Sequence, residues 1–229
     1  MIHSNTASSN ASDSRISLAM MQAELSVAVV SDALDQEGYT RQVPTVSLRP
    51  LTTARLLVGR CRTTLWSDLF HPDPRPYDLE LQAVDACRPD DVLIAAAGGS
   101  MRSGIWGELL STAARNAGCL GAIVDGAVRD VARMTEMGFP VYARGTSPLD
   151  SKDRQRVTDV DVPVEIGGVR IEPGDLIFAD LDGLVVVPQA VESAVIRRAW
   201  NKVKAEDQVR EAIHRGMKAT EAYETFGIL

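Results

Sequence analysis

The middle of the chain alternates between apolar segments typical of strands and segments with helical periodicity. Residues 92–97 are predicted to form a short buried strand, residues 106–117 a helix, and residues 121–124 the next strand. Strands that alternate with helices are typical of folds in which helices pack against a sheet. This feature therefore restricts the chain to an α/β architecture.

Helices and strands are also expected on both sides of this region. Residues 15–39 show a helical pattern, in which Ser31 is expected to cap a second helix and Gly38 to end it. A turn is expected at Asp125–Gly126, and Gly167–Gly168 within an alternating apolar stretch predicts a hairpin. The remaining expected elements are strands 57–66, 141–144, 176–179 and 184–187, helices 77–86 and 129–137, and a charged helical segment from about residue 190.

The organisation of the chain favours one structural domain. Its 229 residues suit a single large domain, and no internal repeat or linker divides them. Residues 1–14 are rich in Ser, Asn and Ala, a composition that buries little surface, so we expect a flexible N-terminal arm. Residues 15–229 are expected to form a single α/β domain that ends in a helical segment.

Composition excludes several classes of protein. The formal net charge is -7, with no cluster of basic residues, which disfavours nucleic-acid binding. Cys61, Cys87 and Cys119 are far apart, so neither a disulfide framework nor a structural zinc site is expected. No apolar run approaches the roughly 20 residues of a membrane span, and no signal-peptide pattern is present. The expectation is a cytoplasmic protein that binds no membrane.

A glycine-rich loop at residues 98–104 follows a predicted strand and opens the next helix. Glycines allow close approach of a ligand, and helix N-terminal amides attract anions, so the loop is a candidate anion site. It is not a nucleoside-triphosphate loop, because Ile105 and Trp106 stand where that motif has Lys and Ser or Thr. The alternative is a tight turn that needs glycine for its backbone conformation alone.

A second cluster, Arg129–Asp130, lies after the strand predicted at residues 121–124. Ends of strands are where open α/β sheets bind ligands. A carboxylate can hold a hard divalent cation, and a guanidinium can stabilise a developing oxyanion. The alternative is an Asp at a helix start beside a solvated Arg.

The two clusters belong to one extended signature. It reads GELLSTAA at 107–114, GAIVDGAVRD at 121–130 and GFPVYARG at 138–145, with weaker matches at 31–34 and 173–188. The signature resembles the family that contains 4-hydroxy-4-methyl-2-oxoglutarate aldolases, 4-carboxy-4-hydroxy-2-oxoadipate aldolases and RraA-like regulators of ribonuclease activity. The resemblance runs from about residue 25 to residue 188.

This resemblance implies a fold, an assembly and a cofactor. Family members have an α/β fold with a central β-structure of the swivelling β/β/α kind, and they form homotrimers or homohexamers whose active sites lie between subunits. The aldolases use Mg²⁺ or Mn²⁺ and no Schiff-base lysine. They also draw an acidic residue from the C-terminal region of a neighbouring subunit, for which Glu206 and Glu211 are candidates here.

The resemblance also implies roles for residues of the signature. Asp130 matches the direct metal ligand, and Glu108 matches an acidic residue that reaches the metal through water. Arg129 matches the residue that contacts the ketone oxygen, so Arg129 and Glu108 are the expected catalytic residues. The substrate carboxylate would be held at the start of the helix, by Gly107 and the backbone amides of Leu109 and Leu110.

The expected function is therefore that of a divalent-metal-dependent lyase. Its substrate would be a small 4-hydroxy-2-oxo acid such as 4-hydroxy-4-methyl-2-oxoglutarate, cleaved to release pyruvate, with oxaloacetate decarboxylation as a side activity. The alternative is a non-catalytic RraA-like regulator that binds a ribonuclease or another protein. Such regulators typically lack the metal-binding acid after the arginine, so the presence of Asp130 favours the enzyme.

Overall fold

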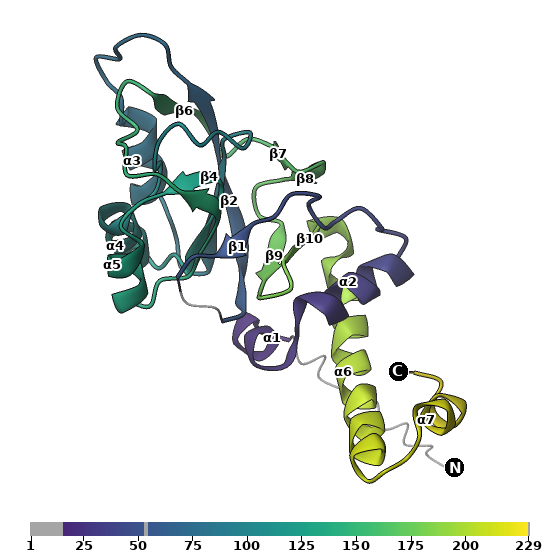
Figure 1. The fold of residues 1–229 in the computed structure, drawn as a ribbon. Coiled ribbons are helices and arrows are strands. Elements are labelled where there is room, and N and C mark those ends of the chain that lie inside the picture. Colours follow the sequence, from purple (N-terminus) through teal and green to yellow (C-terminus); the bar gives the residue numbers. More distant parts are fainter. Residues whose placement is uncertain (1–15, 53–54, 229) are drawn as a thin grey trace, which may run out of the picture.

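The computed structural model describes residues 16–52 and 55–228, whose arrangement is shown in Figure 1. The helices are α1 (Leu18–Glu24), α2 (Val27–Gln36), α3 (Asp78–Asp85), α4 (Glu108–Asn116), α5 (Val131–Glu136), the 3₁₀ helix η1 (Gln189–Val191), α6 (Glu192–His214) and α7 (Ala219–Phe226). The strands are β1 (Arg49–Pro50), β2 (Leu57–Asp68), β3 (Asp91–Ala96), β4 (Gly121–Val128), β5 (Val141–Thr146), β6 (Gln155–Val160), β7 (Val164–Ile166), β8 (Val169–Ile171), β9 (Leu176–Ala179) and β10 (Leu184–Val187).

One mixed sheet organises these elements. Its strand order is β1-β5-β4-β3-β2-β9-β10, and β6 also pairs with β2. Strands β2, β3, β4 and β5 are parallel neighbours, whereas β1, β6, β9 and β10 pair antiparallel. The predicted α/β class is thus confirmed, as a single domain with a curled sheet.

The sheet is covered on both faces, which explains the continuous apolar runs of its central strands. Every residue of β4 is buried. Helices α3, α4 and α5 lie together on one side (Figure 1), over a core that includes Leu93, Trp106 and Phe139. The β7–β8 hairpin covers part of the other face, and its turn is the predicted one, with positive φ at Gly167 and Gly168.

The start of α2 differs from the sequence prediction. Ser26 is its N-cap, and the Ser26 hydroxyl accepts a hydrogen bond of 3.4 Å from the amide of Val29. The Val27 amide donates to the Asp180 carboxylate at 3.0 Å. Ser31 therefore lies inside the helix, and the prediction that it caps one was wrong. Gly38 follows the helix end with a φ of 84°, as expected.

The predicted turn at Asp125–Gly126 was also wrong, because β4 continues through both residues to Val128. The pairing of β4 with β5 shifts register between Val124 and Ala127, which is a bulge rather than a turn. A Cβ on Gly126 would lie 2.9 Å from the Ser100 carbonyl oxygen, so glycine lets the glycine-rich loop pack against the bulge. The bulge carries β4 on toward Arg129.

The C-terminal part is helical, as predicted. Helix α6 packs against α2 and extends away from the sheet, and α7 folds back near its end (Figure 1). Ion pairs join the two packed helices, Arg198 to Glu37 and Lys202 to Asp32. Within the described ranges, no helix is long and apolar enough to cross a membrane. The arm predicted at residues 1–14 lies outside the described residues.

Candidate active site at the start of helix α4

The start of α4 lies against the segment that follows β4, which brings the two predicted clusters together. A Cβ on Gly107 would lie 2.7 Å from Asp130 Oδ2 and 3.2 Å from Arg129 Cγ. The Glu108 amide donates to Asp130 Oδ2 over 3.4 Å. Gly107, Glu108, Arg129 and Asp130, which are separated by some twenty residues in the sequence, thus form one site.

Asp130 adopts an unusual backbone conformation that directs its carboxylate. Its φ of 58° and ψ of 31° lie in the left-handed region, which Asp tolerates better than most residues. Asp130 is the N-cap of α5, but its side chain makes no capping hydrogen bond to that helix. The carboxylate lies beside Gly107 instead and is 47% exposed. It is therefore accessible to a cation or a ligand at the start of α4.

Arg129 is held at both ends. Its backbone amide donates to the Trp106 carbonyl oxygen at 2.8 Å. Its guanidinium Nη2 lies 2.8 Å from Asp150 Oδ2, while Nε lies 3.9 Å from Asp130 Oδ2. The guanidinium remains 37% exposed. A planar cation placed between two carboxylates keeps one orientation, with donors left over for an oxygen of a substrate.

Asp150, in the loop between β5 and β6, was not predicted as a site residue. The Tyr77 hydroxyl donates to its Oδ1 at 2.6 Å, and the Lys152 amide donates to the same oxygen at 2.8 Å. Burial alone would raise the pKa of Asp150, but these hydrogen bonds and Arg129 together lower it below its usual value. Burial and the hydrogen bond to Asp150 raise the pKa of Tyr77 to about 12, so the phenol stays protonated.

Glu80, on α3, is the second residue that the sequence analysis missed. Its residue exposure is only 7%, and its Oε2 is buried without a hydrogen-bond partner among the described residues. Burial and the neighbouring Asp150 carboxylate raise its pKa to about 8, and Arg129 opposes this rise. A signal for it existed: Glu80 shares the helix face of Ala83 and Val84, both buried.

The first turn of α4 offers unoccupied backbone donors. Its N-cap is Gly107, which has no side chain to accept from the helix amides. No hydrogen bond from the amides of Leu109 or Leu110 is found among the described residues, as is normal for the first turn of a helix. The Glu108 carboxylate accepts from the Thr112 hydroxyl at 2.9 Å, one turn along the same helix. The arrangement is compatible with a carboxylate held by Leu109 and Leu110.

The glycine-rich loop itself is a structural turn. Gly98 and Gly99 have positive φ, and a Cβ on Gly104 would lie 2.5 Å from the Ser147 carbonyl oxygen. Three loop amides and the amide that follows them donate to carbonyl oxygens of the chain: Gly99 to Asp125, Ser100 to Ala97, Gly104 to Leu149, and Ile105 to Ala127. The conformational interpretation therefore accounts for the glycines, and the free amides lie at the start of α4.

The residues of the site suit a hard divalent cation better than zinc. Among the described residues, no group of three or more His, Cys, Asp or Glu side chains could enclose a metal. Asp130 and Glu108 supply carboxylate oxygens from two segments that meet at the site. Mg²⁺ is commonly held by one or two carboxylates, with water and substrate oxygens completing its shell. The donor set fits that pattern.

The predicted C-terminal acids take part in local ion pairs along α6 and at its C-terminal end. Glu206 lies 3.6 Å from Lys202 and Glu211 lies 3.4 Å from Arg215. Figure 1 shows α6 well separated from α4, so neither acid completes the site of its own chain. A contribution from a neighbouring subunit stays a prediction.

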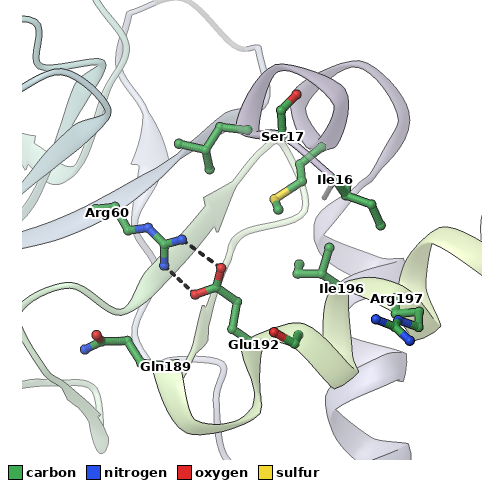
Figure 2. A pocket seen from close by; sticks show the side chains of 10 residues that line it. Ile16, Ser17, Arg60, Gln189, Glu192, Ile196 and Arg197 are labelled. Carbon is green, nitrogen blue, oxygen red and sulfur yellow. Dashed lines mark hydrogen bonds and ion pairs between the residues drawn. The ribbon is translucent and has the colours of Figure 1, made fainter. Parts of the chain in front are cut away.

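A cavity of about 630 Å³ lies elsewhere, between α1, the start of α6 and β2. Figure 2 shows Arg60 and Glu192 in direct contact in its lining. Arg60 Nη2 donates to Glu192 Oε1 at 2.7 Å, and a second contact joins the same two groups. Because this pair is mutually neutralised and shares no residue with the Arg129 cluster, the cavity is not the candidate active site.

Comparisons with known proteins identify a family. The family model described as RraA-like, Aldolase/RraA, matches residues 27–186. A protein of Halalkalibacterium halodurans named "Putative 4-hydroxy-4-methyl-2-oxoglutarate aldolase" is 35% identical over 195 residues, covering 85% of this chain and 87% of that protein. The residues matched by the family model, 27–186, include every residue of the site.

Solved structures give the same fold. An uncharacterised protein from Pseudomonas syringae superposes with a TM-score of 0.80 at 28% identity, covering 89% of this chain and 91% of that one. RraAS2 from Streptomyces coelicolor, described as an unusual member of the RNase ES inhibitor RraA family, superposes with a TM-score of 0.72 at 30% identity, covering 81% of this chain and 91% of that one. Similar chains thus carry both an aldolase name and the name of an RNase-inhibitor family.

Proposed function

Because this chain belongs to the RraA-like Aldolase/RraA family, we propose that it is a divalent-metal-dependent lyase that releases pyruvate from a small 4-hydroxy-2-oxo acid. A substrate such as 4-hydroxy-4-methyl-2-oxoglutarate is in keeping with the name of the Halalkalibacterium halodurans relative. Oxaloacetate is the second substrate, because its decarboxylation passes through the same enolate of pyruvate.

One observation carries this proposal: the Asp130 carboxylate, the Arg129 guanidinium and the first turn of α4 surround the same point. Gly107 lies within van der Waals reach of both side chains. The site therefore offers an acid for a cation, a cation for an oxyanion, and helix amides for a carboxylate. A 2-oxo acid presents its carboxylate and ketone oxygens on adjacent carbons, so it can meet all three.

Residues of the site would bind the substrate and stabilise the charge that forms on it. The amides of Leu109 and Leu110 would bind the substrate carboxylate at the positive end of α4. Arg129 would contact the ketone oxygen and stabilise negative charge on it. A bound Mg²⁺ or Mn²⁺, held by Asp130 directly and by Glu108 through water, would supply Lewis-acid stabilisation of the same oxygen.

The reaction with the 4-hydroxy-2-oxo acid is a retro-aldol cleavage. The 4-hydroxyl gives its proton to a water, its oxygen becomes a carbonyl, and the C3–C4 bond breaks. The electron pair of that bond passes into the enolate of pyruvate, whose oxygen lies against Arg129. A proton added at C3 completes pyruvate. In oxaloacetate the bond to the departing CO₂ breaks instead.

A second candidate is a non-catalytic regulator. It is supported by the likeness to RraAS2 of Streptomyces coelicolor, at 30% identity. Leu109, which is 78% exposed beside the site, would suit a protein contact. The exposed Asp130 carboxylate has no evident use in a regulator, and this favours the lyase.

We also infer a homotrimer or homohexamer. The C-terminal helices support this inference, because α6 reaches far beyond the sheet of its own chain (Figure 1). In an oligomer, Glu206 or Glu211 could approach the site of a neighbour. Size measurement by light scattering would separate the trimer from the hexamer.

Pyruvate release tests the proposed function. The full chain would be assayed with oxaloacetate and with 4-hydroxy-4-methyl-2-oxoglutarate, each with Mg²⁺, with Mn²⁺ and after chelation, against protein-free blanks. Release that chelation abolishes is the expected result. If neither substrate reacts but pyruvate or oxalate binds to the metal-loaded protein, the substrate is another oxo acid. If neither binds, the regulator is the better account.

A further inference from the structure

The first turn of α3 is connected to Arg129 through a single carboxylate. Tyr77 immediately precedes α3 and Glu80 follows three residues later, so both project from the same helix face. The Tyr77 hydroxyl donates to Asp150 Oδ1 at 2.6 Å, and Asp150 Oδ2 lies 2.8 Å from Arg129 Nη2. The orientation of Arg129 thus depends on a brace formed by Tyr77 and Asp150.

Glu80 lies beside this brace in an environment that disfavours its charge. It is 7% exposed, and its Oε2 has no hydrogen-bond partner among the described residues. A buried carboxylate oxygen without a partner is costly when the group is charged, and the group avoids that cost by staying protonated. The amides at the start of α3 favour the ionised form, but this helix-end effect is smaller than the cost of burying an unpaired charge.

Two charged groups dominate the environment of Glu80. Asp150, between β5 and β6, disfavours its ionisation, and Arg129, after β4, favours it. Strand β6 packs against α3, and its charged Arg156 is already paired with Asp73 at 2.6 Å. Helix α4 also packs against α3 and carries one acid of the site, Glu108. The Glu108 carboxylate accepts a hydrogen bond from Thr112 of its own helix.

Building on the lyase function above, we propose that Glu80 is a positioning residue for Arg129. As an uncharged acid it leaves Asp150 and Arg129 as a balanced pair, so the guanidinium can face the substrate oxygen. Once ionised, it adds a buried negative charge beside that partly exposed pair. The local charge of these three groups changes from zero to minus one, which weakens Asp150 as a partner and opposes the negative charge that forms on the enolate.

A pH profile of turnover tests this role. In the wild type, kcat should fall as the pH rises through about 8, where Glu80 ionises, approaching a tenfold loss per pH unit if the ionised form is inactive. Glu80→Gln keeps the shape and removes the ionisation, so its kcat should stay level between pH 7 and 9. Asp85→Asn, an exposed change on the same helix, is the control and should keep the alkaline fall.

Melting temperatures give a readout that needs no activity. Between about pH 4.5 and 8 the unfolded chain ionises Glu80 while the folded chain keeps it protonated, so the wild type loses stability as the pH rises. The melting temperature of Glu80→Gln relative to wild type should therefore increase from pH 5 to pH 8 and then level off. A difference that is constant over this range would overturn the proposal, whatever the enzyme does.

Two further outcomes are decisive. If the melting difference behaves as expected but Glu80→Gln keeps the alkaline fall in kcat, Glu80 does not act on Arg129 and the proposal fails. If the chain has no lyase activity, binding of oxalate with Mg²⁺, measured by calorimetry, replaces kcat. Weaker oxalate binding above pH 8 in the wild type only would support the role of Glu80 without the lyase. Absent binding, or equal pH dependence in both proteins, would overturn it.

Discussion

Arg129 Nη2 lies 2.8 Å from Asp150 Oδ2, and this ion pair joins the end of β4 to the loop that leads into β6. The contact with Asp130 is looser, because Asp130 Oδ2 is 3.9 Å from Nε of the same guanidinium. Arg129 is consequently oriented by one carboxylate while the other remains available to a cation.

Asp150→Asn should lower the rate of pyruvate release without unfolding the protein. The amide keeps the shape of the side chain but loses the charge that orients Arg129, and a misplaced catalytic group can reduce a rate by about 100-fold. The measurement is kcat/KM with oxaloacetate, with the exposed Asp182→Asn as a matched control. An unchanged kcat/KM would show that Asp150 does not orient Arg129.

Arg129→Ala should remove most of the rate, by roughly 100- to 1000-fold, as expected for loss of an oxyanion-stabilising donor. Arg129→Lys should recover only part of it, because an ammonium cannot reach Asp150 and the substrate oxygen as a planar fork does. Steady-state kinetics would separate kcat from KM. A rise in KM with kcat unchanged would mean that Arg129 only binds the substrate.

Gly107→Ala should disturb the metal site selectively. The added Cβ would lie 2.7 Å from Asp130 Oδ2, so the carboxylate must move. Gly145→Ala is the control, because its Cβ would meet only the flexible end of Met101 at 3.0 Å. Calorimetric titration with Mn²⁺ should show weaker binding for Gly107→Ala and unchanged binding for the control. Equal affinities would place the metal away from Asp130.

Asp150 should also contribute to the acid stability of the fold. Its pKa is lowered in the folded chain, so its stabilising contribution is present at neutral pH and is lost as the pH falls through the folded-state value. The melting temperature of Asp150→Asn should lie below that of the wild type near pH 7, and the gap should close in strong acid. A gap that persists there would mean that the substitution acts through packing rather than charge.

Much of the fold could be predicted from the sequence, because its central strands are continuous apolar runs bounded by glycines. The errors arose where tertiary contacts decide the local structure. Ser31 lies inside α2, because that helix begins earlier, where Ser26 caps it and the distant Asp180 accepts from the Val27 amide. The Asp125–Gly126 pair forms a bulge because the glycine-rich loop packs against it.

Only some residues of the site could be predicted from the sequence. Arg129 and Asp130 stand together within a recognisable signature, and Glu108 begins the preceding helix. Asp150, by contrast, comes from a separate loop with no motif of its own, so only folding brings it to Arg129. Glu80 left one trace, an acid on the buried face of α3, but nothing in its own segment indicates what it faces.

The most direct test of the lyase account compares the wild type with Asp130→Asn in one assay, pyruvate release from oxaloacetate with Mg²⁺. The account predicts release by the wild type that chelation abolishes, and no release above the protein-free blank by Asp130→Asn, with equal melting temperatures for the two proteins. Equal metal-dependent rates for the two proteins would contradict the assignment of the metal to Asp130 and, with it, the proposed site.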